Sequence, residues 1–139
     1  MEFNKEGNVV VAKLDHNSDL FDNLLNIMEN IDETCGIINS GIGMIDDFKL
    51  GYYNSKTGNY EWKEYNEPME LLSISGSITD DGSIHMHAQV ADSDHHVHGG
   101  HLDKGKIYNV GEITLLVFKD MILTREKDEE RDMDLLSVK

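Results

Sequence analysis

The chain has 139 residues, one domain's worth, and its 27 acidic against 12 basic residues give a formal net charge of −15. Nucleic-acid binders usually carry a basic stripe that neutralises phosphates, so this charge disfavours direct binding to DNA and to anionic membranes. No apolar run approaches the roughly 20 residues that span a bilayer.

The segment Met1–Gly7 lacks a hydrophobic signal region, and the single cysteine, Cys35, excludes an intrachain disulfide. Both observations predict a protein that stays in the cytosol. Cys35 precedes the apolar stretch Gly36–Ile38, and no base adjacent in sequence argues for an activated thiol. We therefore interpret Cys35 as a small core residue.

The first expected elements in chain order are a strand at residues 9–14 and the one main helix. Ser18 can cap a helix that runs from Asp19 to about Ile31. Apolar residues recur at helical spacing in this segment, namely Leu20, Leu24, Ile27, Met28 and Ile31. The apolar stripe that they form should pack on a sheet.

The rest of the chain up to residue 125 has the pattern of short strands separated by turns. Turn residues occur at Lys56–Asn59, Asp80–Gly82 and Lys104–Gly105, and Pro68 sits where a strand could begin. Short strands with hairpin turns and one helix predict an α+β fold with a largely antiparallel sheet. The expected strands cover residues 36–40, 43–53, 60–65, 69–79, 83–91, 95–102 and 108–119, with a possible last strand at 121–125.

Residues 1–125 are expected to form a single domain, and residues 126–139 a charged C-terminal tail. The segment 125–134 carries mixed charges, which is typical of a solvated, fraying tail or a short surface helix. The apolar residues that follow it would allow the tail to dock on a neighbour. Gly41-Ile42-Gly43 is too short a signal for a nucleotide-binding loop and indicates a bulge or bend in a strand.

The strongest candidates for metal-ligating residues are the two histidines of the motif His85-Met86-His87 and His101, fourteen positions after His87. Residues 83–91 alternate as a half-buried strand requires, so His85 and His87 leave the same face. Three neutral imidazoles that reach one point are typical of a divalent transition-metal site with an open coordination position. The pattern predicts such a site at His85, His87 and His101.

The register of the hairpin decides whether His101 joins the other two histidines. An odd-numbered connection centred near Ser93 would place His101 across from His85 and Gly99 across from His87. An even-numbered connection would turn His101 to the opposite face and destroy the arrangement.

The remaining histidines are expected to face solvent. His96 and His98 have the opposite parity from His101 on the return strand, and His95 sits at the tip of the hairpin. His16, beside the expected helix start, is interpreted as a surface residue. The alternative for all of these side chains is that histidines keep an acidic surface soluble, in which case the domain is purely structural.

The chain also resembles a known family. The motifs that carry the resemblance occur in a specific order over most of the chain, from about residue 5 to 125. They resemble the PPC domain, which plant AT-hook nuclear proteins share with stand-alone prokaryotic proteins. The motifs are Gly41–Gly43, Leu50–Tyr53, Pro68–Ile78, Asp81-Gly82, His85–Ala88, Gly99–Leu102 and Gly111–Ile113.

The resemblance implies an α+β fold with an antiparallel sheet that assembles as a homotrimer. It also implies that His85, His87 and His101 are metal ligands, in agreement with the argument from the strand faces. Since plant members act in chromatin, the resemblance suggests a DNA-associated role. This chain contains no Arg-Gly-Arg-Pro hook and is strongly acidic, so such a role would require a DNA-binding partner.

We expect a trimeric protein that binds zinc or another divalent transition metal and has a regulatory or small-ligand-binding role. The fold is also similar to that of acetolactate decarboxylases and certain zinc-dependent ester hydrolases. The alternative is therefore a zinc-dependent hydrolase or decarboxylase acting on a small carbonyl or ester substrate. A carboxylate near the metal would then act as general base, and the candidates are Glu112 and Glu70.

Overall fold

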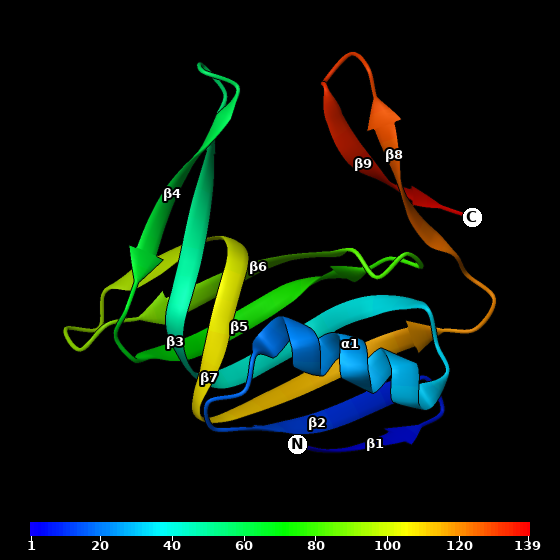
Figure 1. The fold of residues 1–139 in the computed structure, drawn as a ribbon, viewed down its shortest axis with the longest axis horizontal. Coiled ribbons are helices and arrows are strands. Elements are labelled where there is room, and N and C mark those ends of the chain that lie inside the picture. Colours follow the sequence, from blue (N-terminus) through cyan, green and yellow to red (C-terminus); the bar gives the residue numbers. More distant parts are fainter.

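In the computed structural model, which describes residues 1–139, a single helix packs on a seven-stranded antiparallel sheet, as the predicted α+β class requires (Figure 1). The elements are β1 (Glu2–Glu6), β2 (Val9–Asp15), α1 (Leu20–Ile31), β3 (Cys35–Asn54), β4 (Asn59–Tyr65), β5 (Met69–Ile78), β6 (Ile84–Ala91), β7 (Val97–Phe118), β8 (Leu123–Asp128) and β9 (Met133–Val138). The large sheet has the order β1-β2-β7-β6-β5-β3-β4, and β7 also pairs with β3. Strand β1, which pairs with β2 at the sheet edge, was not predicted.

The helix α1 begins one residue later than predicted, and Asp19 caps it instead of Ser18. Asp19 Oδ1 accepts hydrogen bonds from the backbone N–H groups of Phe21 and Asp22, at 2.9 and 3.1 Å. The Ser18 hydroxyl instead donates to the carbonyl of Asp15 at 2.6 Å. The predicted apolar stripe does face the sheet, and its fully or nearly fully buried members are Leu20, Leu24, Ile27 and Met28.

The two longest strands, β3 and β7, are each continuous where the sequence suggested two separate strands. β3 joins the expected strands 36–40 and 43–53, and β7 joins 95–102 and 108–119. Bulges bend β3 instead of ending it, including one between Gly43 and Ile45. Gly43 has a φ of 135°, and a Cβ there would lie 2.1 Å from the Val110 carbonyl oxygen, so the bend requires glycine.

The predicted turn at Lys104-Gly105 is wrong, because both residues lie inside β7. A Cβ on Gly105 would lie 2.5 Å from Cδ1 of the buried Ile45, so this glycine allows β3 and β7 to pack closely. The uninterrupted β7 connects two parts of the sheet. Its first residues pair with β6 and its last residues pair with β2.

The core lies between α1 and the large sheet. Cys35 belongs to this buried part of the chain, as predicted, and its Sγ donates to the carbonyl of Met121 at 3.0 Å. No helix of the structure combines the length and the apolar character that crossing a bilayer demands. Core residues contributed by the strands include Val10, Leu14, Ile38, Ile74, Met86 and Leu115.

Two β-ribbons project from the same side of the large sheet (Figure 1). One is the outer part of β3 with β4, which we call the aromatic arm (Gly51–Trp62), and the other is the β8–β9 hairpin. The hairpin replaces the fraying tail or short helix expected for residues 125–134. Its mixed charges form ion pairs between a strand residue and a residue beyond one end of β9, since Lys127 Nζ lies 2.5 Å from Asp132 in the turn and Lys139 Nζ lies 2.5 Å from Glu126.

Candidate metal centre

Strand β6 presents His85 and His87 on one face and a buried apolar row on the other. Met86, Ala88 and Val90 point into the core, which fixes the orientation of the alternating strand. His85 is consequently half-buried and His87 is exposed, both on the face away from the core. The predicted strand and the predicted facing of the two imidazoles are confirmed.

His101 reaches the same face from β7, but through a register that differs from the predicted one. His87 pairs with His101, and Gly99 pairs with Gln89. The predicted pairs, His85 with His101 and His87 with Gly99, are therefore wrong by two residues. A shift of two residues preserves the face of every side chain, so His101 still lies with the other two histidines.

The register follows from the turn that connects β6 to β7, which is centred on Asp94 instead of Ser93. Asp92 closes this turn because its Oδ1 accepts from the backbone N–H groups of Asp94 and His96, at 3.0 and 2.9 Å. His95 takes a left-handed conformation with φ of 64°, and its N–H donates to the Asp92 carbonyl at 3.0 Å. The side chain of Asp92 thus selects a five-residue connection.

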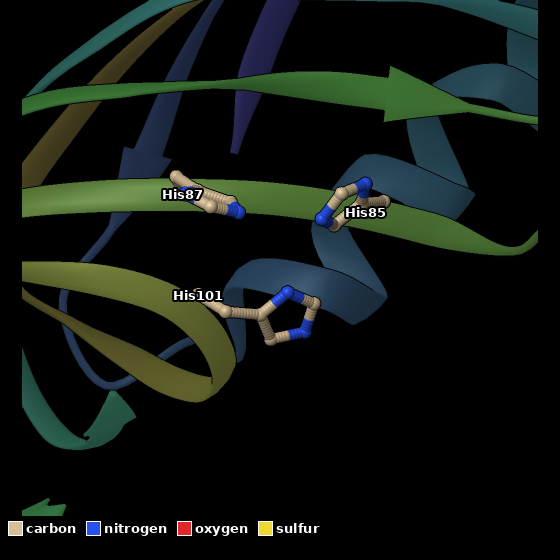
Figure 2. A group of neighbouring side chains, drawn as sticks. All are labelled: His85, His87 and His101. Carbon is tan, nitrogen blue, oxygen red and sulfur yellow. The ribbon is translucent and has the colours of Figure 1, made fainter. Parts of the chain in front are cut away.

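The three imidazoles converge on one small volume (Figure 2). One ligand-capable nitrogen of each lies within 4.8 Å of those of the other two. The ring centroids are separated by 5.0 Å for His85 and His101, 5.2 Å for His85 and His87, and 5.6 Å for His87 and His101. Binding of all three nitrogen atoms to one zinc ion at about 2.0 to 2.1 Å would require the rings to move somewhat closer together than in this arrangement.

The electrostatics of the cluster favour neutral imidazoles with available lone pairs. Burial lowers the pKa of His85 from 6.5 to about 4, and the neighbouring charges of His101, Arg125 and His87 act in the same direction. Burial and His87 also lower the pKa of His101, against the opposing effect of Asp103. Since a metal binds only the unprotonated ring, both directions favour ligation.

His101 carries a further sign of a missing partner. Its Nδ1 is buried and has no hydrogen-bond partner, which is costly for a ring nitrogen unless something else engages it. A divalent cation bound by the three rings would engage such an atom. The residues present therefore fit a metal of the class that imidazole prefers, such as zinc, and they leave a coordination position open.

Aromatic rings of the aromatic arm cover His101 on one side. Its ring centroid lies 5.3 Å from that of Tyr60 and 5.8 Å from that of Trp62, both on β4. Glycines make this approach possible, because a Cβ on Gly51 would lie 2.6 Å from the Trp62 ring and one on Gly100 would lie 2.5 Å from the Gly51 carbonyl oxygen. The arm thus supplies a rigid apolar wall next to the cluster.

A cavity of about 600 Å³ adjoins the cluster, between the aromatic arm and the β8–β9 hairpin. His85 and His101 form part of its wall. The hairpin supplies Arg125, whose guanidinium donates to Ser77 Oγ at 2.9 Å. Asp81 also lines this cavity, and hydrogen bonds from Thr79 and Ser83 hold the pKa of its carboxyl below the usual range.

The other histidines lie outside the cluster. His95 and His96 are exposed at the turn, as predicted. His98 is half-buried instead of solvent-facing, because its Nε2 lies 2.9 Å from Asp92 Oδ2 and its ring packs on Tyr65. His16 is exposed, as predicted, and its Nδ1 accepts from the backbone N–H of Asn109 at 3.0 Å.

The two predicted carboxylate candidates are exposed and are not among the grouped ligand atoms. Glu70 pairs with Ala91, four residues along β6 from His87, a separation of about 13 Å at the rise of a strand. Glu112 pairs with Lys13 and Ile42 in the part of β7 that lies against β2. The structure thus brings together the three predicted histidines but neither glutamate.

Sequence reasoning missed the residues that surround the cluster. Arg125 belonged to a segment interpreted as a solvated tail, and nothing local in the sequence placed it beside His85. Asp81 looked like a turn residue, which it also is. Tyr60 and Trp62 alternate along an expected strand, but the alternation alone could not indicate that this strand lies beside His101.

Comparisons with known proteins place the chain among relatives of one family. The sequence profile of the Plants and Prokaryotes Conserved (PCC) domain matches residues 1–119. A comparison with curated proteins finds no match. Three solved structures show the same fold.

A metal-containing protein from Archaeoglobus fulgidus is 27% identical, with a TM-score of 0.80 over 97% of each chain. A protein from Ralstonia eutropha JMP134, named "Putative DNA-binding protein", is 26% identical, with a TM-score of 0.85 over 97% of this chain and 94% of that chain. A plant- and prokaryote-conserved (PPC) protein from Pyrococcus horikoshii is 21% identical, with a TM-score of 0.79 over 98% of this chain and 94% of that chain.

Proposed function

Because the chain belongs to the Plants and Prokaryotes Conserved domain family, we propose that it binds a divalent transition metal through His85, His87 and His101. The observation that carries this proposal is the convergence of the three imidazoles within 4.8 Å on one face of the β6–β7 ladder. The metal-containing relative from Archaeoglobus fulgidus supports it. Zinc is the ion we favour, because three histidines with an open fourth position are a common zinc site.

The chain's own residues prepare the site for the ion. Burial lowers the pKa of His85 to about 4 and also lowers the pKa of His101, which favours the unprotonated rings, and the rings of Tyr60 and Trp62 cover His101 on one side. A bound divalent ion would supply a Lewis acid with one position open to a ligand. The site therefore suits a small-ligand-binding or regulatory protein.

Zinc titration of tag-free protein by calorimetry, after dialysis against a chelator, tests the metal site. We expect one zinc per chain in the wild type and in His95→Ala, whose exposed ring lies at the turn. His87→Ala should lose at least tenfold in affinity, because it removes one of three ligands. Equal zinc binding by His87→Ala and His95→Ala would refute the assignment.

We propose that the protein acts as a homotrimer in the cytosol. Exposed apolar side chains support a larger assembly, notably Leu136 and Val138 of the β8–β9 hairpin, which are 42% and 59% exposed. The single cysteine fits a reducing compartment. Light scattering coupled to size exclusion should give three times the 15.7 kDa of one chain, and a monomer mass would contradict the trimer.

For a DNA-associated role we propose that a partner protein supplies the contact with DNA. The relative from Ralstonia eutropha carries DNA binding in its name, but the net charge of −15 on this chain repels phosphates. The isolated protein should therefore leave a duplex unshifted in a gel at 150 mM salt. A retarded band that weakens steeply with salt would show direct binding.

One observation favours a second candidate function, a zinc-dependent hydrolase or decarboxylase. Asp81 provides a carboxylate in the same cavity as His85 and His101, where a general base is needed. Zinc-loaded protein would then hydrolyse p-nitrophenyl acetate in a chelator-sensitive reaction, with kcat reduced in Asp81→Asn. If zinc-loaded protein shows no turnover above zinc-free protein, this candidate fails and binding alone remains.

A further inference from the structure

Arg125 is a partly buried cation that forms no ion pair, although, in addition to the hydrogen bond from Thr79, its charge acts at longer range on the Asp81 carboxyl and lowers the pKa of that group. Its guanidinium donates to the hydroxyl of Ser77 at 2.9 Å, and no carboxylate oxygen lies within 4.0 Å of it. The other half-buried cations all have such a partner, namely Lys5 with Glu33, Lys49 with Asp103, and Lys104 with Asp47. In a chain with 27 acidic residues, Arg125 is therefore the exception among the half-buried cations, because it has no carboxylate partner within 4.0 Å.

The position of Arg125 connects it to the metal cluster. Ser77, which is buried, pairs with His85 across the β5–β6 ladder, so the two side chains share a face. The guanidinium and the His85 ring both line the cavity of about 600 Å³ between the β8–β9 hairpin and the aromatic arm. Arg125 therefore lines the same cavity as two of the three histidines, His85 and His101.

A guanidinium has five N–H donors, and only one hydrogen bond from Arg125 to another residue of the chain is present. Partial removal from water without a compensating anion costs free energy, and a ligand carboxylate would offset that cost through charge-assisted, bidentate hydrogen bonds. We infer that Arg125 binds the carboxylate group of a small ligand in the cavity beside the three histidines. This inference rests on the proposed metal site, whose ion would attract the same group.

The remaining wall of the cavity restricts the class of carboxylate. Asp81, Asp132 and Asp134 also line it, and their negative charges disfavour anions of higher charge, such as phosphates and polycarboxylates, more strongly than a monocarboxylate. Leu135 and Leu136, which follow Asp134 on β9, provide apolar surface in the same wall. The cavity therefore suits a monocarboxylate with a short apolar chain, of a size that a volume of several hundred Å³ can hold.

The test is a calorimetric titration of the zinc-loaded full chain with butanoate and, separately, with the neutral isostere butanamide. Arg125→Gln removes the charge at similar length, and Arg131→Gln is the matched control. Arg131 lies on the same hairpin but its guanidinium contacts Asp128 at 2.9 Å, outside the cavity. Zinc stoichiometry and melting temperature are recorded for every variant.

We expect butanoate to bind the wild type and Arg131→Gln within about twofold of each other, and Arg125→Gln at least tenfold more weakly. Butanamide should bind the wild type at least tenfold more weakly than butanoate, a comparison that does not depend on the folding of any variant. The butanoate affinity of Arg125→Lys should lie between those of Arg131→Gln and Arg125→Gln, because lysine keeps the charge but lacks the planar guanidinium.

Several results would overturn the inference. The inference fails if the zinc-loaded wild type binds no butanoate. It also fails if Arg125→Gln binds butanoate with the same affinity as the wild type. Tighter binding of inorganic phosphate than of butanoate would also reject the monocarboxylate. In each of these cases the metal site itself stands, whereas failure of the wild type to bind zinc would reject the proposed function and this inference together.

Discussion

His87 and His101 face each other directly across the antiparallel β6–β7 ladder, with His85 two residues further along β6. This pairing makes the cluster a property of the hairpin register. Any change that slides β7 by one residue would turn His101 to the other face, whereas a slide of two residues would preserve the face but change the neighbours. The ion, the close backbone packing at Gly100 and the turn closed by Asp92 all act on this register.

Zinc should stabilise the folded protein, because its ligands come from two strands and converge only when the hairpin is formed. At a free zinc concentration one hundred times the dissociation constant the stabilisation is about 2.7 kcal/mol. For a domain of this length that corresponds to roughly 10 °C in melting temperature. Scanning calorimetry with and without zinc measures the shift. His101→Ala should show almost none, and a wild-type melting temperature that ignores zinc at neutral pH would contradict the prediction.

Gly100→Ala should destabilise the protein and weaken the metal site. A Cβ at position 100 would lie 2.5 Å from the Gly51 carbonyl oxygen, so β7 must move away from β3. Overpacking of this kind costs about 1 to 3 kcal/mol, measurable by urea denaturation. The adjacent Gly99→Ala is the control, since its nearest contact is a more tolerable 3.1 Å from the Ala88 carbonyl oxygen. Equal losses in the two variants would show that the approach to Gly51 is not the cause.

Asp92→Asn should destabilise the protein at pH 7 and much less in acid. The hydrogen bond from His98, with a backbone N–H bond from His96, lowers the pKa of Asp92 from 3.8 to about 2. A carboxylate with a depressed pKa in the folded state contributes stability that is present above about pH 4 and is lost as the pH falls through about 2. Denaturation series from pH 7 to 2.5 should therefore show the stability of the two proteins converging below about pH 4.

The matched control for that experiment is Asp94→Asn in the same turn. The Asp94 side chain is exposed and makes no hydrogen bond or ion pair, so its replacement should leave stability unchanged within about 0.5 kcal/mol. A difference between wild type and Asp92→Asn that stays constant down to pH 2.5 would mean that the charge of Asp92 does not hold the turn.

Periodicity predicted the parts of the fold that depend on local burial. The alternation around Met86 and the helical spacing of Leu24 and Ile27 were sufficient to identify β6 and α1, because side chains on one face must be buried together. Boundaries were less predictable. Gly105 resembled a turn residue, yet it lies within β7 because Ile45 of a distant strand occupies the space where a Cβ would be.

The sequence by itself determined that His85 and His87 share a face, because side chains alternate along one strand, but it left open whether His101 joins them. Only the tertiary structure decided that His101 pairs with His87 and that Arg125 of the β8–β9 hairpin lies beside His85. The physical reason is the distance along the chain between the residues that are in contact. Strand alternation is a local property of the backbone, whereas the pairing of β7 with β6 and the approach of the β8–β9 hairpin to Ser77 depend on contacts between residues farther apart in the chain.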